Sequence, residues 1–345
     1  MAKQMRVAMY CNNRDVRLQE MPKPKPGAGE LLVRIMASGI CGSDMLEWYR
    51  IKKAPIVLGH EIAGEVAEVG EGVRRFKPGD RVVVSHHVPC NTCRYCIAGN
   101  HTVCETLHTT NFDPGGFAEY VRVPAINVDR GTFPMPDSMS FEEGAFCEPL
   151  ACVVRGQRNA GLRPGQSVLV LGSGISGILH ILLARATGAG RIIATDVRKF
   201  SLEKAKECGA DFVLNASEDI PARVRELNDG HGADLVVVCT EPLSAFMQGL
   251  ESVDRAGTVL CFATTKPGVD LPVPINQFWR NCVKIMSSYA NSPYDLEVAM
   301  ELIRAGRVNV RPLISHRLGL AETGKGFGIM AGAENCLKII IEPQR

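Results

Sequence analysis

The 345-residue sequence has almost no net charge and no long apolar run. It carries 39 lysine and arginine residues against 37 aspartate and glutamate residues, which gives a formal net charge of +2 with histidine neutral. This balance argues against binding to nucleic acid or to an anionic membrane surface. The longest apolar stretch, around residues 178–186, contains His180 and Arg185 and is far shorter than the ~20 apolar residues of a membrane-spanning helix. The amino terminus also lacks the apolar segment of a signal peptide, so we expect a cytoplasmic protein.

Cysteine and glycine, by contrast, are abundant. The sequence has 13 cysteines, an odd number that cannot pair completely within one chain, and 34 glycines. A chain of this length buries enough surface to fold without disulfides, and the cytoplasm keeps thiols reduced. Clustered cysteines in such a protein therefore indicate metal binding or catalysis.

The strand and helix patterns predict two domains, as does the length at about 150 residues per domain. The first 150 residues contain short strand-like runs separated by glycine and proline, such as "ELLVRIMASGIC", which indicate a barrel or sandwich. From about residue 164, six buried strands alternate with helices, a pattern typical of a parallel α/β sheet. One of these helices, "SLEKAKECGA", is expected to begin with Ser201 as its N-cap.

The end of the sequence is expected to return to the first domain. A helix in "DLEVAMELIRAG" and a strand in "ENCLKIIIEP" follow the last strand of the α/β pattern. We therefore expect one domain to consist of residues 1–155 and 291–345, and the other to be inserted between them as residues 156–290.

A glycine-rich segment in the inserted domain predicts a dinucleotide site. In "VLVLGSGISG", Gly172, Gly174 and Gly177 follow a strand and open a helix. Such glycines allow a tight turn and let the backbone at the helix start, which includes Ile175 and Ser176, approach a pyrophosphate. A purely structural strand–helix turn and a methyl-donor site on a similar fold are the alternatives.

The next strand ends on an acid that predicts which dinucleotide binds. Asp196 lies 22 residues after Gly174, close to the ~20 expected for a carboxylate that binds the ribose hydroxyls. It favours NAD, because a carboxylate repels the 2′-phosphate of NADP. Arg198 is either a solvated residue at the helix start or a partial phosphate ligand, which would favour NADP. Thr240 follows a later strand and is expected near the nicotinamide, since ligands bind at the carboxyl ends of such strands.

The clearest metal signature is the segment "PCNTCRYCIAGNHTVC". Its cysteines, Cys90, Cys93, Cys96 and Cys104, are spaced C-x2-C-x2-C-x7-C. Four thiolates in one short segment are typical of a closed, tetrahedral, structural zinc site. An iron–sulfur cluster is the alternative, but its common run has a last gap of about three residues followed by proline. Chance clustering of core cysteines is disfavoured because the segment is polar.

Three other segments carry single residues that can bind a metal. "GICGSD" contains Cys41, "VLGHEIAGEV" contains His60 and Glu61, and "AFCEPLACV" contains Glu148. A thiolate, an imidazole and a carboxylate can form a catalytic zinc site with an open fourth position, which four sulfur ligands cannot. Each residue taken singly is more often structural, so spacing alone does not establish this site.

These segments occur in an order that resembles a known family. "GICGSD", "GHEIAGEV", "GDRV", the four-cysteine segment, "GGFAEY", "CEPLACV" and the glycine-rich fingerprint together span nearly the whole chain. The sequence resembles the zinc-dependent medium-chain dehydrogenases/reductases, in the branch of polyol and threonine dehydrogenases. The resemblance implies a GroES-like, β-rich catalytic domain with a structural zinc lobe at residues 86–108. It also implies a Rossmann, doubly wound, six-stranded parallel cofactor domain, and assembly as a homodimer or homotetramer.

The resemblance also implies a role for each residue of the second metal site. Cys41 and His60 match catalytic zinc ligands. Glu61 is a ligand in many members of the family, and Glu148 matches a position that binds zinc directly or through water. Because the two glutamates can exchange during turnover, the resemblance leaves open which of them is the ligand at rest.

Two further residues match the family's proton-handling and positioning groups. Asp44 matches a residue that orients the zinc-binding histidine, and Ser43 matches the hydroxyl that binds the substrate alcohol and relays its proton. Two departures are visible: Leu46 stands where related enzymes often carry a relay histidine, and Ser288 stands where sorbitol dehydrogenases carry a substrate-binding arginine. The Leu46 departure leaves the proton-exit route open, to water or to another group, and the Ser288 departure argues against sorbitol itself as the substrate.

The predicted function is zinc-dependent, NAD-linked oxidation of a secondary alcohol to the ketone. A polyol, sugar or cyclitol is the expected substrate, and NADP is the less favoured cofactor. Alternatives within the class are threonine, a vicinal diol such as butanediol, or a simple secondary alcohol. A catalytically inert protein that keeps only the structural zinc is the alternative from a different class.

Overall fold

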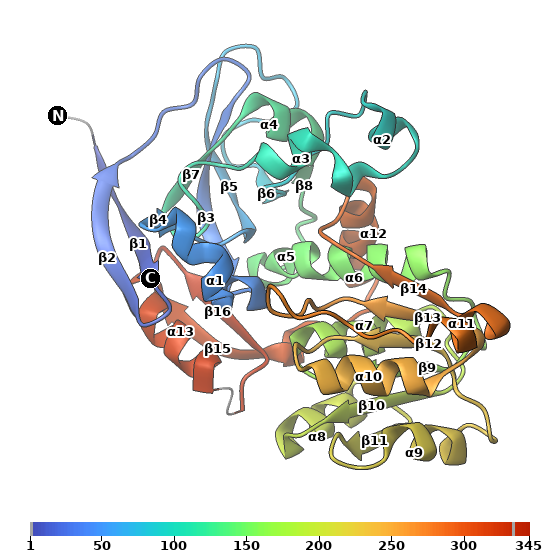
Figure 1. Cartoon of the computed structure of the whole chain (residues 1–345). Helices are drawn as coiled ribbons and strands as arrows, with labels where there is room; N and C mark the ends of the chain where they lie inside the picture. Colours follow the sequence, from blue (N-terminus) through green and yellow to red (C-terminus); the bar gives the residue numbers. More distant parts are fainter. Residues whose placement is uncertain (1–2, 333–334) are drawn as a thin grey trace. The chain divides into compact units, whose positions relative to one another are not determined.

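Three sheets organise the residues that the computed structural model describes, 3–332 and 335–345 (Figure 1). Two compact units contain them. One unit comprises the residues up to Ala151 together with Ala290–Arg345, and the other comprises Cys152–Tyr289. Residues 1 and 2 of the expected first domain, and Glu334 of the expected last strand, lie outside the described residues.

The first unit contains two of the sheets. The smaller has the strand order β2-β1-β4, from β1 (Gln4–Asn12), β2 (Asp15–Pro22) and β4 (Ile56–Val57). The larger has the order β15-β16-β3-β5-β6-β8, with β7 beside β3. Its strands are β3 (Leu31–Gly39), β5 (Glu61–Val69), β6 (Arg81–Val84), β7 (Tyr120–Val123), β8 (Thr132–Pro134), β15 (Ile314–Gly319) and β16 (Lys338–Glu342).

Both ends of the chain build this unit. Strand β16, near the carboxyl terminus, pairs antiparallel with β3 through Ile340 and Gly39. One apolar core joins Met5 and Val7 from the first strand with Ile339 and Ile341 from the last. The apolar alternation in these strands therefore buries one shared core that residues from both termini complete.

Short helices connect the strands of the first unit. Most have only one or two turns, and side chains of Cys41, Ser140 and Ser292 cap the starts of η1, α5 and α12. They are η1 (Gly42–Met45), α1 (Glu47–Arg50), η2 (Ile51–Lys53), α2 (Arg94–Ile97), η3 (His101–Val103), α3 (Glu105–Thr109), α4 (Ala125–Gly131), α5 (Phe141–Ala145), α12 (Pro293–Arg304), η4 (Arg311–Leu313), η5 (Leu320–Glu322) and α13 (Thr323–Gly332).

The second unit is a six-stranded parallel sheet with the order β11-β10-β9-β12-β13-β14. Its strands are β9 (Val168–Leu171), β10 (Ile192–Asp196), β11 (Phe212–Asn215), β12 (Ala233–Val238), β13 (Val253–Cys261) and β14 (Lys284–Ser287). Its helices are α7 (Ile175–Ala186), α8 (Lys199–Glu207), α9 (Ile220–Leu227), α10 (Leu243–Ser252) and α11 (Ile275–Asn281). The chain order reverses between β9 and β12, which is where such sheets bind ligands.

Two sequence-based details differ from the structure. The predicted N-cap of α8, Ser201, is wrong: Arg198 is the N-cap, and Ser201 is buried inside the helix. The helix begins early because Asp196 Oδ1 accepts the backbone N–H of Arg198 at 2.9 Å and fixes the turn after β10. The boundary between the units falls after Ala151 rather than residue 155, inside helix α6 (Cys147–Ala160).

No helix among residues 3–332 and 335–345 is long and apolar enough to cross a membrane.

Candidate active site

The pairing of β3 with β5 brings two distant segments together. In this antiparallel pair, Gly39 at the end of β3 lies opposite Glu61 at the start of β5. Cys41 therefore follows one strand where His60 precedes the other. Gly39 is needed here, because a Cβ atom at this position would lie 1.9 Å from Glu61 Oε2.

The result is a cluster of three metal-binding side chains. Cys41 Sγ, a ring nitrogen of His60 and a carboxylate oxygen of Glu61 all lie within 4.8 Å of one another. A thiolate, an imidazole and a carboxylate at these separations fit a zinc ion with an open coordination position. The structure thus assembles three of the residues predicted for the catalytic metal.

Asp44 and Arg50 support this cluster from one side. Asp44 is fully buried, and its Oδ1 lies 3.5 Å from His60 Nδ1 and 3.4 Å from Arg50 Nη2. Its Oδ2 accepts the backbone N–H of Cys41 at 3.1 Å. Asp44 therefore contacts both Cys41 and His60, and its role in orienting a zinc-binding histidine stays a prediction.

The charges around His60 favour a cation at this cluster. Burial disfavours the charged imidazole, but Asp44 and Cys41 outweigh it and hold the pKa of His60 well above its ordinary value. The same carboxylate and sulfur would stabilise a bound metal ion.

Ser43 lies between Cys41 and Arg50. Its hydroxyl donates to Cys41 Sγ at 3.4 Å and accepts from Arg50 Nη2 at 3.0 Å. Arg50 Nε also donates to the Ser43 carbonyl at 3.1 Å. Sequence reasoning did not single out Arg50, whose long side chain reaches back across seven residues from α1.

A second missed residue, Lys338, lies on the other side of the cluster. Its ammonium donates to both Glu61 oxygens, at 2.8 and 2.6 Å, and to the Ile40 carbonyl at 3.1 Å. Burial lowers the pKa of Lys338, but the nearby Glu61 and Cys41 charges more than compensate and raise it above its ordinary value. A signal was present in the sequence: a lysine that opens the apolar strand "KIII" is buried and needs an anionic partner.

Glu148 stands apart from the three-residue cluster. It is buried at the start of α6, and its Oε1 accepts from Asn291 Nδ2 at 3.1 Å. Among the residues that the structure describes, Glu148 does not join the group of mutually close ligand atoms. The role of Glu148 as an alternative zinc ligand stays a prediction.

Two consecutive histidines border the cluster. The ring centroid of His86 lies 4.9 Å from that of His60 and 3.8 Å from that of His87. Burial lowers the pKa of His87 to about 3, and burial together with the neighbouring His87 and His60 lowers that of His86 well below its ordinary value. Burial therefore disfavours the charged form of both imidazoles.

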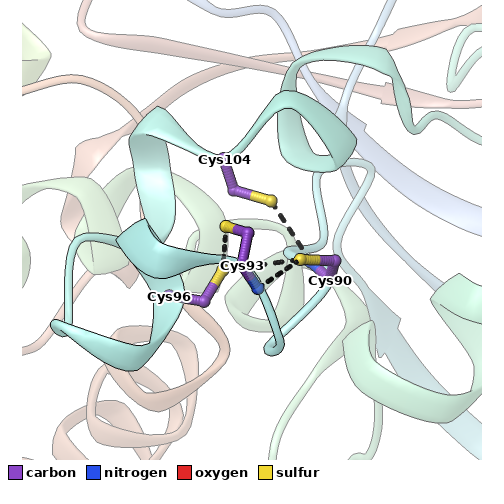
Figure 2. A group of neighbouring side chains, drawn as sticks. All are labelled: Cys90, Cys93, Cys96 and Cys104. Carbon is purple, nitrogen blue, oxygen red and sulfur yellow. Dashed lines mark hydrogen bonds between the residues drawn. The ribbon is translucent and has the colours of Figure 1, made fainter.

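The four predicted cysteines of the lobe come together in one place. The sulfur atoms of Cys90, Cys93, Cys96 and Cys104 all lie within 4.8 Å of one another. Figure 2 shows the four side chains turned toward a common centre. This arrangement fits four thiolate ligands around one structural zinc ion.

Backbone N–H groups further prepare this lobe for a metal. Cys90 Sγ accepts from the N–H groups of Thr92 and Cys93 at 3.4 and 3.2 Å, and Cys104 Sγ accepts the N–H of Cys90 at 3.4 Å. Hydrogen bonds from Thr92 and Cys93 lower the pKa of the Cys90 thiol to about 5. Burial and the adjacent sulfurs raise the pKa of the Cys96 thiol to about 12, so its thiolate is costly to form. A divalent cation between the four thiolates would remove this cost.

In the second unit, the glycine-rich turn joins β9 to α7. Gly172 adopts φ +92°, and Gly174 is the N-cap of the helix. A Cβ atom at Gly177 would lie 2.0 Å from the Gly172 carbonyl oxygen, so the helix packs closely on the turn. The backbone N–H groups of the first helical turn, at Ile175 and Ser176, thus lie at a site typical of pyrophosphate binding.

The other predicted cofactor residues surround this turn. Asp196 ends β10, and its two carboxylate oxygens accept the N–H groups of Ser173 and Arg198, both at 2.9 Å. The Oδ2 oxygen, which accepts only the Ser173 N–H among the described residues, keeps capacity for a further hydrogen bond. The Arg198 side chain folds back so that its Nε lies 3.4 Å from Asp196 Oδ1. Thr240 follows β12 and lies beside Gly172, whose added Cβ would be 2.9 Å from Thr240 Cβ.

Comparison with known proteins identifies the family. Residues 27–137 match the alcohol dehydrogenase GroES-like domain, and residues 176–305 match the zinc-binding dehydrogenase domain. The sorbitol dehydrogenase of Gallus gallus is 33% identical over 91% of this chain and 89% of its own length. The chain belongs to the zinc-dependent medium-chain alcohol and polyol dehydrogenases. It is an oxidoreductase acting on CH–OH groups, and the predicted pairing of a GroES-like domain with a six-stranded Rossmann domain is confirmed.

Two further members of this family match over nearly their whole length. The sorbitol dehydrogenase of Bacillus subtilis is 30% identical over 99% of this chain and 98% of its own. Among solved structures, the alcohol dehydrogenase of Thermus sp. ATN1 is 30% identical and superposes with a TM-score of 0.88, covering 98% of this chain and 99% of that one.

Proposed function

We propose that this dehydrogenase oxidises a secondary alcohol of a polyol, sugar or cyclitol to the ketone, with NAD as the hydride acceptor. The observation that supports this most directly is the mixed cluster of Cys41, His60 and Glu61, backed by the buried Asp44. A closed four-sulfur site cannot bind substrate, whereas this donor set leaves a position open. When bound, zinc supplies a Lewis acid that lowers the pKa of an alcohol, and the nicotinamide accepts the hydride.

The chain's own residues position the reacting groups. Cys41, His60 and Glu61 would hold the metal, with Glu148 as the alternative carboxylate. Ser43 Oγ lies against Cys41 Sγ, so it is the hydroxyl that would accept the alcohol's proton while it passes its own proton on. Arg50 holds this hydroxyl but cannot take its proton, since the guanidinium is always charged. With Leu46 in the place of a relay histidine, the proton leaves Ser43 through water.

The proposed preference for NAD rests on Asp196. Its carboxylate is fixed by two backbone N–H groups at the end of β10, where a ribose would lie. Arg198 offsets part of this negative charge, but it faces the carboxylate rather than presenting a free phosphate site. We expect Asp196→Ala to lower kcat/KM with NAD by about 10-fold or more. The ratio of kcat/KM with NAD to kcat/KM with NADP should therefore fall. A wild-type enzyme that turns over NADP faster than NAD would overturn this assignment.

The central experiment is a substrate panel combined with a zinc count. Polyols, cyclitols, sugars, 2,3-butanediol and threonine are each tested by following NADH absorbance, and zinc per chain is measured in the same preparation. The proposal predicts two zinc ions per chain and turnover of polyhydric substrates. One zinc per chain with no turnover of any alcohol would instead indicate an inert protein that keeps only the structural zinc.

The proposal includes assembly into a homo-oligomer. Strand β14 lies at the edge of the second unit's sheet, and within the described part of the chain it pairs only with β13. Apolar side chains are exposed beside this edge, including Ile285 and, on α11, Trp279 and Ile275. Unpaired edges with exposed apolar groups tend to be covered by another chain. Light scattering of the wild type and of Ile285→Lys tests this: a wild-type monomer would contradict it.

A further inference from the structure

His86 is a partly buried polar residue that the proposed mechanism does not use. It follows β6 in the segment "VVSHHVPC", and its Nδ1 is buried with no hydrogen-bond partner among the described residues. Buried polar atoms in folded proteins nearly always have a partner, because an unpaired one loses its hydration without compensation. A phenylalanine would fill a similar volume without this cost, so a histidine here calls for an explanation.

The backbone around His86 is held in place by a dedicated set of hydrogen bonds. Asn127, which is fully buried, donates through Nδ2 to the carbonyls of Ser85 and His86 at 3.0 and 2.9 Å. Ser85 Oγ donates to the His87 carbonyl at 2.9 Å. Thr110 Oγ1 accepts the N–H of Val88 at 2.9 Å. The imidazole of His86 is therefore presented by a fixed backbone rather than by a mobile loop.

The position of His86 is next to the reacting centre. Its ring packs 4.9 Å from the ring of His60, one of the three clustered metal ligands, and 6.3 Å from Phe112 on another side. His87 packs against it at 3.8 Å and limits its rotation. A molecule bound at the cluster of Cys41, His60 and Glu61 would therefore have the His86 imidazole as a neighbour.

We propose that His86 is a specificity-determining residue that hydrogen-bonds a second hydroxyl of the substrate, adjacent to the carbon being oxidised. The inference rests on the proposed alcohol oxidation and narrows its substrate class to vicinal diols, polyols and cyclitols over monohydric alcohols. A neutral imidazole can both donate and accept, which suits a hydroxyl. A site that pairs its buried polar group only with the right substrate rejects analogues that lack the partner group.

The test compares two substrates that differ by one hydroxyl, trans-1,2-cyclohexanediol and cyclohexanol. His86→Phe keeps the aromatic volume and removes both nitrogens, whereas His86→Asn supplies an amide at the place of Nδ1. We expect His86→Phe to lower kcat/KM for the diol by about 10- to 100-fold, mainly through KM, and to leave that for cyclohexanol within about twofold. His86→Asn should restore most of the diol activity. His231→Phe, the same change at an exposed histidine of the second unit, is the matched control.

The other outcomes are equally informative. An equal loss for both alcohols, or a loss of zinc in His86→Phe, would show that His86 only positions His60 and would overturn the proposal. No loss for either alcohol would overturn it as well. Calorimetric binding of the two alcohols to zinc-loaded protein separates the inference from the proposed function. Suppose that the wild type oxidises neither alcohol but binds the diol at least 10-fold more tightly than His86→Phe does. The proposed function then fails, and the inference about His86 stands. If the wild type and His86→Phe bind the diol equally well, the inference is overturned.

Discussion

The two sulfur-containing clusters of the first unit are built in opposite ways. The lobe takes Cys90, Cys93, Cys96 and Cys104 from one segment of 15 residues, and its sulfurs are held mainly by nearby backbone N–H groups. The other cluster takes its residues from two segments that are 19 or more residues apart in sequence and that strand pairing brings together. Side chains that carry charge, rather than backbone groups, hold that cluster on two sides.

This difference supports the proposal that the lobe is structural and that the mixed cluster is reactive. A set of four like ligands gives a metal no open position and needs only local geometry. A mixed set that is surrounded by Asp44, Arg50 and Lys338 keeps its ligands adjustable, because Glu61 has both a lysine and a metal position within reach. Substitutions in the two clusters should therefore separate activity from stability.

The largest effect is expected from Cys41→Ser. Losing the only sulfur ligand of the mixed cluster should reduce NADH formation to below detection, because the remaining donors no longer hold zinc in place. The zinc content should fall from two ions per chain to one, while circular dichroism and the melting temperature change little. Cys208→Ser, at a partly exposed cysteine that follows α8, is the matched control. Full turnover in Cys41→Ser would contradict a role for this cluster in catalysis.

The counterpart in the lobe is Cys104→Ser. A structural zinc supplies on the order of 10 kcal/mol in small zinc domains, so loss of one of four ligands should lower the melting temperature by about 10 °C or more. Freshly purified protein should retain activity for as long as it stays folded, since the four lobe cysteines and the cluster of Cys41, His60 and Glu61 form separate groups of ligand atoms. Thermal unfolding with and without added zinc measures this. An unchanged melting temperature with one zinc lost would show that the lobe does not stabilise the fold.

The sequence predicts the four cysteines of the lobe well, but it does not reveal that Arg50 and Lys338 contact the mixed cluster. The reason is physical. Local spacing specifies the four cysteines, and the apolar strands with their glycine-rich turn specify the parallel sheet and Asp196. Arg50 and Lys338 gain their roles only through tertiary contacts, and Lys338 comes from the opposite end of the chain. Residues whose partners are distant in sequence are thus the ones that pattern analysis misses. The Ser201 error has a different, local origin: the helix start is set by the Asp196 carboxylate, which accepts the backbone N–H of Arg198 two residues later.

Lys338→Met tests whether the ion pair between Lys338 and Glu61 stabilises the mixed cluster. In zinc-free protein, this change leaves Glu61 buried without its cation, which we expect to cost about 3–5 kcal/mol of unfolding free energy. Zinc should offset much of this loss, because Glu61 is then free to bind the metal. Urea unfolding with and without a chelator provides the measurement.

The double variant Lys338→Met/Glu61→Gln is the control for this experiment. It removes both charges and should recover most of the stability lost in the single variant, although not its zinc binding. If the single variant were as stable as the wild type in zinc-free protein, the ion pair would not be the partner that Glu61 requires.

A smaller effect is expected from Asp44→Asn, which keeps the shape of the side chain and removes its charge. Loss of a carboxylate behind a metal-binding histidine typically costs 10- to 100-fold in metal affinity or activity, which a zinc titration and kcat/KM can measure. A pH test follows in zinc-free protein, where Asp44 contributes to the raised pKa of His60. A raised folded pKa adds stability that is complete below the ordinary histidine pKa and disappears as the pH rises through the folded value. In Asp44→Asn the NMR-monitored pKa of His60 should therefore fall and this pH-dependent stability should shrink. If the pKa of His60 were unchanged in Asp44→Asn, Cys41 alone would account for the raised pKa of His60. The carboxylate charge of Asp44 would then not contribute to it.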